Sequence, residues 1–480
     1  MSVVVSVDQT GTELLLAYYG DDFTGSTDAM EALAKNGART LLFLEPPSPG
    51  LLAEKFPDVQ CIGVAGISRS LGPAAMEREL QPVFDALSVL NPRLVHYKVC
   101  STFDSSPDIG SIGKAMEIGR GVFGSGRYIP ILAGVPELGR YTVFGHHFAA
   151  SIGGVYRLDR HPVMSRHPVT PMDESDLMLH LAKQTDISIG LLSVLDLKLD
   201  PGDVDRLLEE KVSDGSGAVL FDVLDEPMLE QAGRLMWNET HRGPVFAVGS
   251  SGVEYALTSH WRSIGLIGEG AANRGVSGRV SASVSVPSGG GPGKAERLLV
   301  ISGSCSPVTA GQIRYALQHG FTGIRAPVME LVDEAYAGQA QEALAQQVSE
   351  ALREGKSVVV YTSTGPDDDT IGPLRERLIS LGRDPSESGA LLGRQLGQVA
   401  RRLVLECGLR RLLAAGGDTS GYLVKELGIY ALELLEPLVP GGPLCRAYAE
   451  EAGLDGLELS LKGGQVGPPE YFLQVLEGRQ

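Results

Sequence analysis

Two acidic residues stand directly after a short apolar segment near the start of the sequence. The segment Glu13–Tyr19 is followed by Gly20, Asp21 and Asp22, and a helical pattern begins soon afterwards. A carboxylate at the end of a buried strand is well placed to orient or deprotonate a hydroxyl group. Helix capping, or compensation of the helix dipole, is the alternative explanation for Asp22 and the nearby Thr24.

Two cationic residues follow other predicted strands of the same sheet. Arg69 comes shortly after the apolar segment Cys61–Gly66, and Lys98 lies near the end of Leu94–Val99. Either of them alone would be read as a solvated surface cation. At neighbouring strand ends they could bind a carboxylate or a phosphate. Together with Asp22 they favour a pocket for a small polar acid.

The second half of the sequence contains three turns rich in glycine and hydroxyl residues, each at or near the end of a predicted strand. They are Ile301–Ser306, Gly416–Gly421 and Lys462–Gly467. Glycines let backbone N–H groups approach a ligand, and the N-terminus of a following helix favours anions. An ordinary capped helix would explain any one of these turns, but three in one domain indicate a nucleotide cradle.

The common nucleotide-binding signatures are missing. The segment Gly289–Lys294 imitates a Walker loop, but Ser288 stands where the first glycine belongs and Ala295 stands where a hydroxyl residue should bind Mg²⁺. Protein-kinase motifs and a dinucleotide fingerprint after a strand are not found either. If the three turns bind a nucleotide, they do so with a different arrangement.

Short apolar strands alternate with amphipathic helices along the sequence, which predicts an α/β fold with mostly parallel sheets. A stretch at 265–296 is rich in glycine and serine, the composition of a flexible connector. We therefore predict two α/β domains, 1–264 and 297–480, with an active-site cleft between them. The predicted strands include Thr40–Leu44, Ser281–Val286, Arg297–Ile301, Ser357–Tyr361 and Arg411–Ala415, and the predicted helices include Thr27–Asn36, Thr309–Gln318, Gly389–Glu406 and Ser420–Leu427.

The charge balance limits the classes of partner. The 480 residues include 41 Lys and Arg against 59 Asp and Glu, a formal net charge of −18 at pH 7. This argues against a broad basic surface for nucleic acid or anionic membrane, whereas a small anionic substrate needs only a few local cations. No signal peptide or membrane-spanning apolar run is visible. We expect a soluble, cytoplasmic protein.

Neither cysteines nor histidines indicate a metal site. The five cysteines are scattered and never spaced CxxC, which argues against a zinc or disulfide framework and for a reducing compartment. His146 and His147 would point to opposite sides of a strand. The run Asp367–Asp369 beside Gly365 is interpreted as a solvated turn. No metal-ligating residue is predicted.

Taken together, these motifs resemble the four-carbon acid sugar kinase family, formerly a domain of unknown function, over essentially the whole chain. In the first half the resemblance rests on GDDFTGSTDAMEALA (Gly20–Ala34), ISRS (Ile67–Ser70), YKVCST (Tyr97–Thr102), HPVTPMDESDL (His167–Leu177) and VGSSG (Val248–Gly252). In the second half it rests on SGSCSPVTAGQI (Ser302–Ile313), GGDTSG (Gly416–Gly421) and KGG (Lys462–Gly464).

The resemblance implies ATP-dependent phosphorylation of a hydroxyl of an acid sugar, with Mg²⁺ accompanying ATP. The N-terminal domain would hold the acid sugar and the C-terminal domain ATP. The expected substrate-binding residues are Asp21, Asp22, Arg69, Lys98, Cys100, Ser101 and Thr102, with Asp22 as the catalytic base that positions or deprotonates the hydroxyl. The expected ATP-binding residues are Ser302, Ser304, Gly416, Gly417, Asp418, Thr419, Ser420, Gly463 and Gly464.

One stretch departs from the pattern of many family members. Kinases for threonate, erythronate or 3-oxo-tetronate commonly have KVDST followed by a leucine, an arginine and a glycine. Here Cys100 replaces the aspartate, and Phe103–Ser106 follows. The stretch CSTFDSSP is similar to the 3-oxo-isoapionate kinase branch, which acts on a branched acid. We therefore expect 3-oxo-isoapionate as substrate, giving a 4-phosphate, with 3-oxo-tetronate, D-erythronate or threonate as alternatives.

Two hypotheses from other functional classes stay open. The chain could be a non-catalytic sugar-acid sensor that kept the fold, which the absence of ADP release would reveal. It could also be an aldolase or decarboxylase that forms a Schiff base through Lys98, which borohydride trapping would reveal. A homodimer is expected from the resemblance alone.

Overall fold

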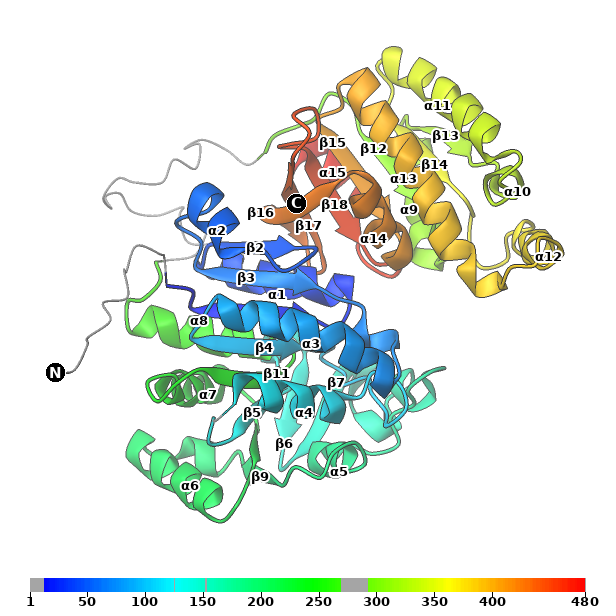
Figure 1. Ribbon diagram of the computed structural model, residues 1–480. Helices are drawn as coiled ribbons and strands as arrows, with labels where there is room; N and C mark the ends of the chain where they lie inside the picture. Colours follow the sequence, from blue (N-terminus) through cyan, green and yellow to red (C-terminus); the bar gives the residue numbers. More distant parts are fainter. Residues whose placement is uncertain (1–12, 125, 152, 269–291, 480) are drawn as a thin grey trace. The chain divides into compact units, whose positions relative to one another are not determined.

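The computed structural model describes residues 13–479 apart from 125, 152 and 269–291. The chain divides into two compact α/β units, Met1–Val276 and Ser277–Gln480 (Figure 1). The predicted fold class, two α/β domains with mostly parallel sheets, is confirmed. Most of the linker expected at 265–296, and the strand expected at Ser281–Val286, lie outside the described residues. The expected cleft and the assignment of roles to the two halves stay predictions.

Unit 1 is built on a parallel sheet. Its strands, in spatial order, are β2 (Thr40–Phe43), β3 (Cys61–Ala65), β1 (Leu16–Gly20), β4 (Leu94–Lys98), β11 (Val245–Gly249), β5 (Ile129–Leu132), β10 (Ala218–Phe221) and β9 (Ile189–Leu192). A small antiparallel sheet consists of β6 (Arg140–Val143), β7 (His146–Ser151) and β8 (Gly154–Arg157). The helices are α1 (Phe23–Lys35), α2 (Pro49–Lys55), α3 (Pro73–Val89), α4 (Ile112–Phe123), α5 (Leu177–Ala182), α6 (Pro201–Ser213), α7 (Glu226–Glu239) and α8 (Gly252–Ser263).

The helices of unit 1 cover the parallel sheet from both faces. Helices α3 and α4 pack together on one face, and α1, α7 and α8 pack on the other. The central strands are buried on both sides, as a parallel sheet requires. Strand β1 continues into α1, and the neighbouring strand β4 continues into α4. The loops after these two strands thus leave toward opposite faces of the sheet. Ligand sites of open α/β sheets form at such switch points.

Unit 2 has a mixed sheet. Its strands, in spatial order, are β13 (Thr322–Arg325), β14 (Val358–Tyr361), β12 (Leu299–Ser302), β15 (Arg411–Ala415), β18 (Glu458–Lys462), β17 (Gly442–Ala449) and β16 (Ile429–Val439), and β17 runs antiparallel to both of its neighbours. The helices are α9 (Pro307–Gln318), α10 (Val328–Leu331), α11 (Ala337–Arg353), α12 (Ile371–Ser380), α13 (Ser388–Cys407), α14 (Gly417–Glu426) and α15 (Tyr471–Glu477).

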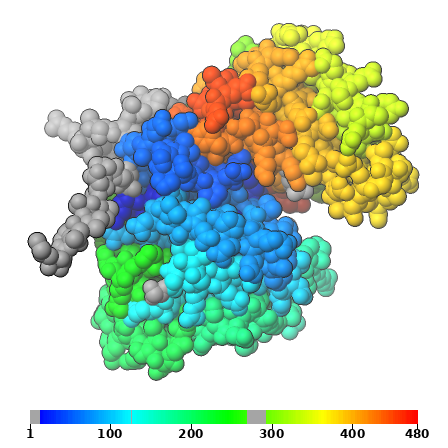
Figure 2. Space-filling view, in the orientation of Figure 1, coloured from blue at the N-terminus to red at the C-terminus, as the bar shows by residue number. Residues whose placement is uncertain are grey.

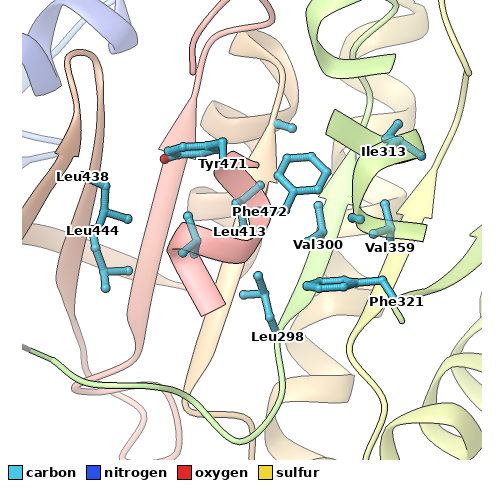
Figure 3. Close-up of a cluster of buried hydrophobic side chains, with 13 residues drawn as sticks. Leu298, Val300, Ile313, Phe321, Val359, Leu413, Leu438, Leu444, Tyr471 and Phe472 are labelled. Carbon is cyan, nitrogen blue, oxygen red and sulfur yellow. The ribbon is translucent and has the colours of Figure 1, made fainter. Parts of the chain in front are cut away.

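One face of this sheet carries a continuous apolar core. Val300 of β12 and Leu413 of β15 pack against Ile313 of α9 and against Tyr471 and Phe472 of α15 (Figure 3). Helices α11, α13 and α14 pack with one another on the other side. The loops after the adjacent strands β12 and β15 thus also diverge, one into α9 and the other into α14. Unit 2 has its own switch point. None of the helices in the described part of the chain is long and apolar enough to cross a membrane.

A buried ion pair holds α15 against this sheet. Arg411 is fully buried, and its Nε donates to Glu458 Oε2 at 2.7 Å. Its Nη1 donates to the carbonyl oxygens of Val475 at 2.7 Å and Leu476 at 2.9 Å, at the end of α15. Because every one of these acceptors is buried or half-buried, losing the guanidinium leaves several of them without a donor.

We expect Arg411→Met to lower the free energy of unfolding by about 3 kcal/mol, the low end for breaking a buried pair, since Arg410 still binds Glu458. Urea unfolding of the full chain measures the change. The control is Arg402→Met, whose ion pairs with Glu342 and Glu406 are solvent-exposed, and its loss of stability should be clearly smaller. Equal losses in the two variants would contradict the structural role given to Arg411.

Candidate functional site

The two acidic residues after β1 and the arginine after β3 form one compact cluster. Arg69 donates from Nε to Asp21 Oδ2 at 3.0 Å and from Nη2 to Asp21 Oδ1 at 2.6 Å, a bidentate pair. Its Nη1 donates to Asp22 Oδ2 at 2.7 Å. Asp21 is buried, while Asp22 and Arg69 are half-buried. One guanidinium therefore fixes both carboxylates at the edge of the sheet.

Asp22 has a structural task as well as its place in the cluster. It is the N-cap of α1, and its Oδ1 accepts a hydrogen bond from Gly25 N at 2.6 Å. The capping alternative raised by the sequence is thus correct, and it does not exclude the other role, because the second oxygen faces Arg69. Both oxygens of this carboxylate are held in a fixed orientation.

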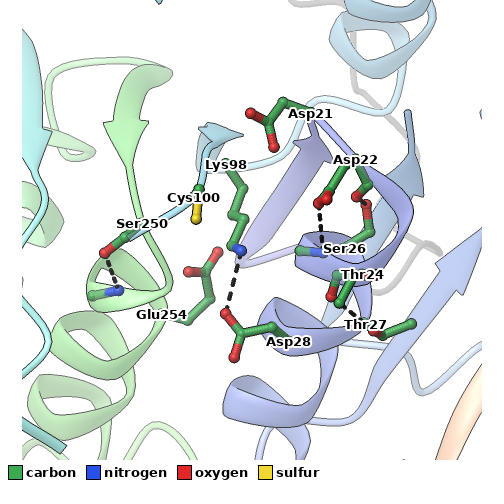
Figure 4. A network of polar contacts seen from close by, with 12 residues as sticks. Asp21, Asp22, Thr24, Ser26, Thr27, Asp28, Lys98, Cys100, Ser250 and Glu254 are labelled. Carbon is green, nitrogen blue, oxygen red and sulfur yellow. Dashed lines mark hydrogen bonds and ion pairs between the residues drawn. The ribbon is translucent and has the colours of Figure 1, made fainter. Parts of the chain in front are cut away.

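Lys98 reaches the same place from the neighbouring strand. The register pairs Gly20 of β1 with Lys98 of β4, so the two strands end side by side. The Lys98 ammonium is buried and lies 3.2 Å from Asp28 Oδ2 on α1 (Figure 4). A Cβ at Gly25 would lie 2.5 Å from Asp22 Oδ1 and 2.8 Å from Lys98 Nζ. Only glycine at this position lets α1 approach the two charged groups so closely.

The electrostatics of this cluster keep both cations charged. Burial by itself lowers the pKa of Lys98, but Asp28, Asp22, Cys100 and Asp21 together hold that pKa above its ordinary value. Burial likewise opposes the charge of Arg69, yet the neighbouring carboxylates hold its pKa well above the ordinary value. The contacts above use one of the ammonium's three donors and three of the guanidinium's five, so two donors on each group have no acceptor among the described residues.

The loop after β4 carries the remaining residues predicted for the acid sugar. Cys100 Sγ lies 3.0 Å from Thr102 Oγ1, and Thr102 donates in turn to Asp104. Burial, followed by the nearby Asp104, raises the pKa of the Cys100 thiol, which is therefore uncharged at neutral pH. The structure brings Cys100, Ser101 and Thr102 to the end of the strand that carries Lys98.

The small antiparallel sheet holds this loop in place. His147 of β7 donates from Nε2 to the carbonyl oxygen of Ser101 at 2.8 Å, and Thr142 of β6 donates to His147 Nδ1 at 2.9 Å. Burial lowers the pKa of His147 to about 4, so the ring is neutral and its two nitrogens can play these different roles. His147 therefore supports the loop after β4, whereas His146 bonds with Ser175.

Sequence reasoning missed three residues of this region. Asp28, the partner of Lys98, lies inside α1, where its spacing looks like an ordinary helical position. His96 and Glu254 are both fully buried, with Nδ1 and Oε1 2.6 Å apart, on the same face of β4 as Lys98. The second oxygen of Glu254 has no partner among the described residues. Only the VGSSG motif, two residues before Glu254, pointed toward this segment.

Residues predicted for ATP gather at the switch point of unit 2. A Cβ at Gly303 would lie 2.1 Å from Thr419 Oγ1, so the loop after β12 touches the start of α14. Gly416 adopts a φ of +125°, which favours glycine, and its N–H donates to the carbonyl of Lys462 at 2.9 Å. A Cβ there would lie 3.4 Å from Ser304 N. The first two glycine-rich turns thus form one surface.

The third turn completes this surface from the other side. A Cβ at Gly464 would lie 2.8 Å from Ser304 Oγ, and the Gly464 carbonyl accepts from Thr309 Oγ1 at 2.8 Å. Gly463 precedes it in the same turn, and Ser420 is buried in the first turn of α14. Ser302 ends β12 with a buried Oγ that has no partner among the described residues.

The first turn of α14 contains two further residues predicted for ATP, Gly417 and Asp418. A Cβ at Gly417 meets nothing within 4 Å, so the start of α14 is open at this point. For Asp418 the structure describes only the backbone, in the first turn of α14. No group of three or more His, Cys, Asp or Glu side chains suited to a metal ion occurs in the described part of the chain.

An open hollow elsewhere on unit 2 contains none of the predicted residues. It is lined by residues of the segment from α10 to α12, among them Glu330, Tyr336 and Arg377. Figure 2 shows this part of the chain, in yellow, at the outer surface. Arg377 is already paired with Asp333. The two strand-end clusters are therefore better candidates for the functional site.

Known proteins of similar sequence are kinases. The chain is 44% identical over 466 residues, 97% of its length and 95% of the relative's, to a 3-oxo-isoapionate kinase of Paraburkholderia graminis. It is 28% identical over 463 residues, 96% of its length and 97% of the relative's, to a 3-oxo-tetronate kinase of Pseudomonas savastanoi pv. phaseolicola. A 3-oxo-tetronate kinase of Cupriavidus necator is 29% identical over 96% of each chain.

Solved structures support the fold. A crystal structure from Salmonella typhimurium LT2, provisionally described as a tRNA synthase, superposes with a TM-score of 0.75 at 22% identity and covers 97% of this chain and 99% of its own. The Haemophilus influenzae protein HI1011 gives 0.71 at 22% identity, with 96% and 98% covered. At this identity the likeness concerns the fold alone.

Family models match each unit separately. A sugar-binding N-terminal domain matches residues 16–257, and a nucleotide-binding C-terminal domain matches residues 299–472. The first range contains the Asp21, Asp22, Arg69 and Lys98 cluster, and the second contains the three glycine-rich turns. Because both domains match in order and a 44% identical kinase spans 97% of the sequence, the chain belongs to the four-carbon acid sugar kinase family.

Proposed function

We propose that the chain is an ATP-dependent kinase that phosphorylates a hydroxyl of a small acid sugar, with 3-oxo-isoapionate as the preferred acceptor. Unit 1 would bind the acid sugar and unit 2 would bind ATP. The observation that carries the proposal is the convergence of Lys98 and Arg69 with three aspartates at one strand edge of unit 1. The named acceptor comes from the 44% identical relative.

Cationic donors and a carboxylate acceptor are the two kinds of group that would contact the acid sugar. The free donors of Lys98 and Arg69 would bind the carboxylate of the substrate, since both cations stay charged. Asp22 would accept a hydrogen bond from the acceptor hydroxyl, because its carboxylate is held at the edge of the cluster by Gly25 and Arg69. Ser101 and Thr102 would contact other hydroxyls of the sugar.

The proposed reaction asks mainly for positioning and charge neutralisation. ATP, accompanied by Mg²⁺, supplies the γ-phosphoryl group, and the transition state of such transfers is loose, so little deprotonation is needed early. Asp22 is accordingly proposed to orient the hydroxyl and to take its proton late in the transfer. The open start of α14 at Gly417 and the unpartnered Oγ of Ser302 fit phosphate oxygens. No residue is assigned to Mg²⁺.

The loop after β4 supports the branched acceptor over the linear acids. Cys100 places an uncharged thiol where many family members have a carboxylate, which makes the site less negative and changes its shape. The linear acids 3-oxo-tetronate, D-erythronate and threonate remain the alternative acceptors, since 3-oxo-tetronate kinases are also among the relatives.

A Schiff-base mechanism at Lys98 is disfavoured by the same charges. The nucleophile in such chemistry is the neutral amine, whereas the aspartates around Lys98 hold its pKa above the ordinary value. A sensor would bind the same ligands without turnover, so only catalysis separates it from the kinase. The cytoplasmic location and the homodimer stay predictions.

The first test is ADP release from Mg-ATP with a panel of acids: 3-oxo-isoapionate, 3-oxo-tetronate, D-erythronate, and D- and L-threonate. We expect turnover with 3-oxo-isoapionate and a lower kcat/KM for the linear acids. Higher kcat/KM for a linear acid would overturn the acceptor assignment. Binding of ATP and acid without ADP release would favour the sensor.

Asp22→Asn should lower kcat by about 10²-fold or more, the range for a general base, and leave ATP affinity unchanged. Asparagine caps helices about as well as aspartate, so the fold should persist. The matched control is Asp225→Asn, an N-cap of α7 whose carboxylate accepts from Met228 N, three residues on, as that of Asp22 does from Gly25 N. Undiminished turnover in the Asp22 variant would remove the assignment.

Gly417→Val should weaken ATP binding at least tenfold and leave acid-sugar binding largely intact. A Cβ at this position has nothing within 4 Å, so the valine side chain would occupy space proposed for the phosphates. Isothermal titration calorimetry with ATP measures the effect. The control is Gly372→Val at the start of α12, where a Cβ also meets nothing within 4 Å. Loss of both ligands in the Gly417 variant would instead indicate a folding defect.

A further inference from the structure

A lysine that forms no ion pair with any described side chain is buried at the glycine-rich turns of unit 2. Lys462 is the last residue of β18, and only 1% of its surface is exposed. Its Nζ donates to Thr309 Oγ1 at 2.9 Å. Among the described side chains no ion pair of this ammonium is found, and no charged group contributes to the shift of its pKa. Burying an ammonium is costly unless an anion or several acceptors compensate it.

The position of Lys462 in the sheet places it next to Ser302. The register aligns Ser302 of β12 with Ala415 of β15, and Ala415 with Lys462 of β18. In parallel strands, residues in one such row point to the same face. The unpartnered hydroxyl of Ser302 and the uncompensated ammonium of Lys462 therefore flank one strand end on the face that α9 covers.

The N-terminus of α9 adds positive potential at the same point. Thr309 is in the first turn of this 12-residue helix, and its hydroxyl donates to the Gly464 carbonyl while it accepts from Lys462. The partial positive charge of a helix N-terminus disfavours a bare cation and favours an anion. A phosphate beside Ser302, Ser304 and Lys462 would satisfy all of these groups together.

We propose that Lys462 is a binding residue for the terminal phosphates of a nucleoside triphosphate, and that these phosphates supply the counter-charge for its buried ammonium. This inference rests on the proposed function, because it takes ATP to bind in unit 2. The Lys462 ammonium would be the positively charged group at the phosphates. The residues predicted from the sequence would contact ATP mainly through glycine backbone and hydroxyl groups.

The surroundings of Lys462 make its charge sensitive to pH above neutrality. Burial lowers its pKa to about 8, and no charged group contributes to this shift. Titratable residues at the N-termini of the packed helices include Glu470, the N-cap of α15, Tyr471 in its first turn and Asp418 in the first turn of α14. The Tyr471 hydroxyl is bonded to Ser460 and to the Gly442 carbonyl, and the Asp418 side chain lies outside the described atoms.

The sign of the pH dependence follows from this pKa. If binding requires the charged amine, then the fraction of competent protein falls about tenfold between pH 7 and pH 9 for a group with a pKa of about 8. The terminal phosphate of ATP loses its last proton near pH 6, so its own titration cannot weaken binding in this range. ATP affinity should therefore decrease as the pH rises.

The experiment measures ATP and AMP binding to the full chain by calorimetry at pH 7 and pH 9. For the unaltered chain we expect the Kd for ATP to rise about tenfold at the higher pH, while the Kd for AMP, which lacks the terminal phosphates, changes little. In Lys462→Met we expect ATP binding at pH 7 to weaken at least tenfold and to lose its pH dependence. Lys462→Arg, which keeps the charge, should also bind independently of pH.

The control is Lys356→Met, an exposed lysine of the same unit paired with Glu354, which should bind ATP as the unaltered chain does. A pH-independent Kd for ATP in the unaltered chain, or an unchanged Kd in Lys462→Met, would overturn this inference and leave the proposed function standing. Failure of the unaltered chain to bind ATP at all would overturn both. The pH series of the unaltered chain needs no variant to fold.

Discussion

The organisation of both candidate sites depends on one constraint, which is that parallel strands end in register at a single edge of their sheet. In unit 1, Gly20 and Lys98 occupy one row, and in unit 2, Ser302, Ala415 and Lys462 occupy another. Next to each row, the connections that follow two neighbouring strands leave toward opposite faces of the sheet, which opens a gap above the strand ends. The same arrangement therefore positions a cluster of charged side chains in one unit and a glycine-lined cradle in the other.

The two clusters solve the problem of buried charge in different ways. In unit 1 the charges compensate one another, because Arg69 binds two aspartates and Lys98 binds a third. That arrangement stays charged without a ligand. In unit 2 the cradle has glycine backbone, hydroxyl groups and one ammonium without a carboxylate partner among the described side chains. A bound anion would supply a counter-charge for the ammonium in unit 2. In unit 1 the side chains already compensate one another, so a bound anion would be an additional partner.

Much of this arrangement could be predicted from the sequence, and the exceptions have physical reasons. The strand Arg411–Ala415 was predicted with its observed bounds, since a short apolar run ends at two glycines. The first strand begins at Leu16, three residues later than its apolar pattern suggests. The antiparallel strands β16 and β17 were not predicted, because they break the alternation of strand and helix. Asp28 was not predicted because only the folded chain brings it to Lys98. His96 and Glu254 were not predicted because they are far apart in the sequence and meet only in the folded chain.

The close packing at Gly25 limits how this protein could acquire a new substrate. Any side chain at that position would displace Asp22 or Lys98. A substitution there would therefore disturb the charged groups on the β1 side of the candidate acid-sugar site. In the loop after β4, Cys100 bonds with Thr102 and Thr102 with Asp104, and Cys100 and Thr102 carry no charge that a neighbouring helix must fit, whereas Phe103 and Ser105 are buried and more restricted. If this loop contacts the acid sugar as proposed, substitutions at Cys100 and Thr102 would change the contacts to the acceptor at less structural cost than substitutions at Gly25.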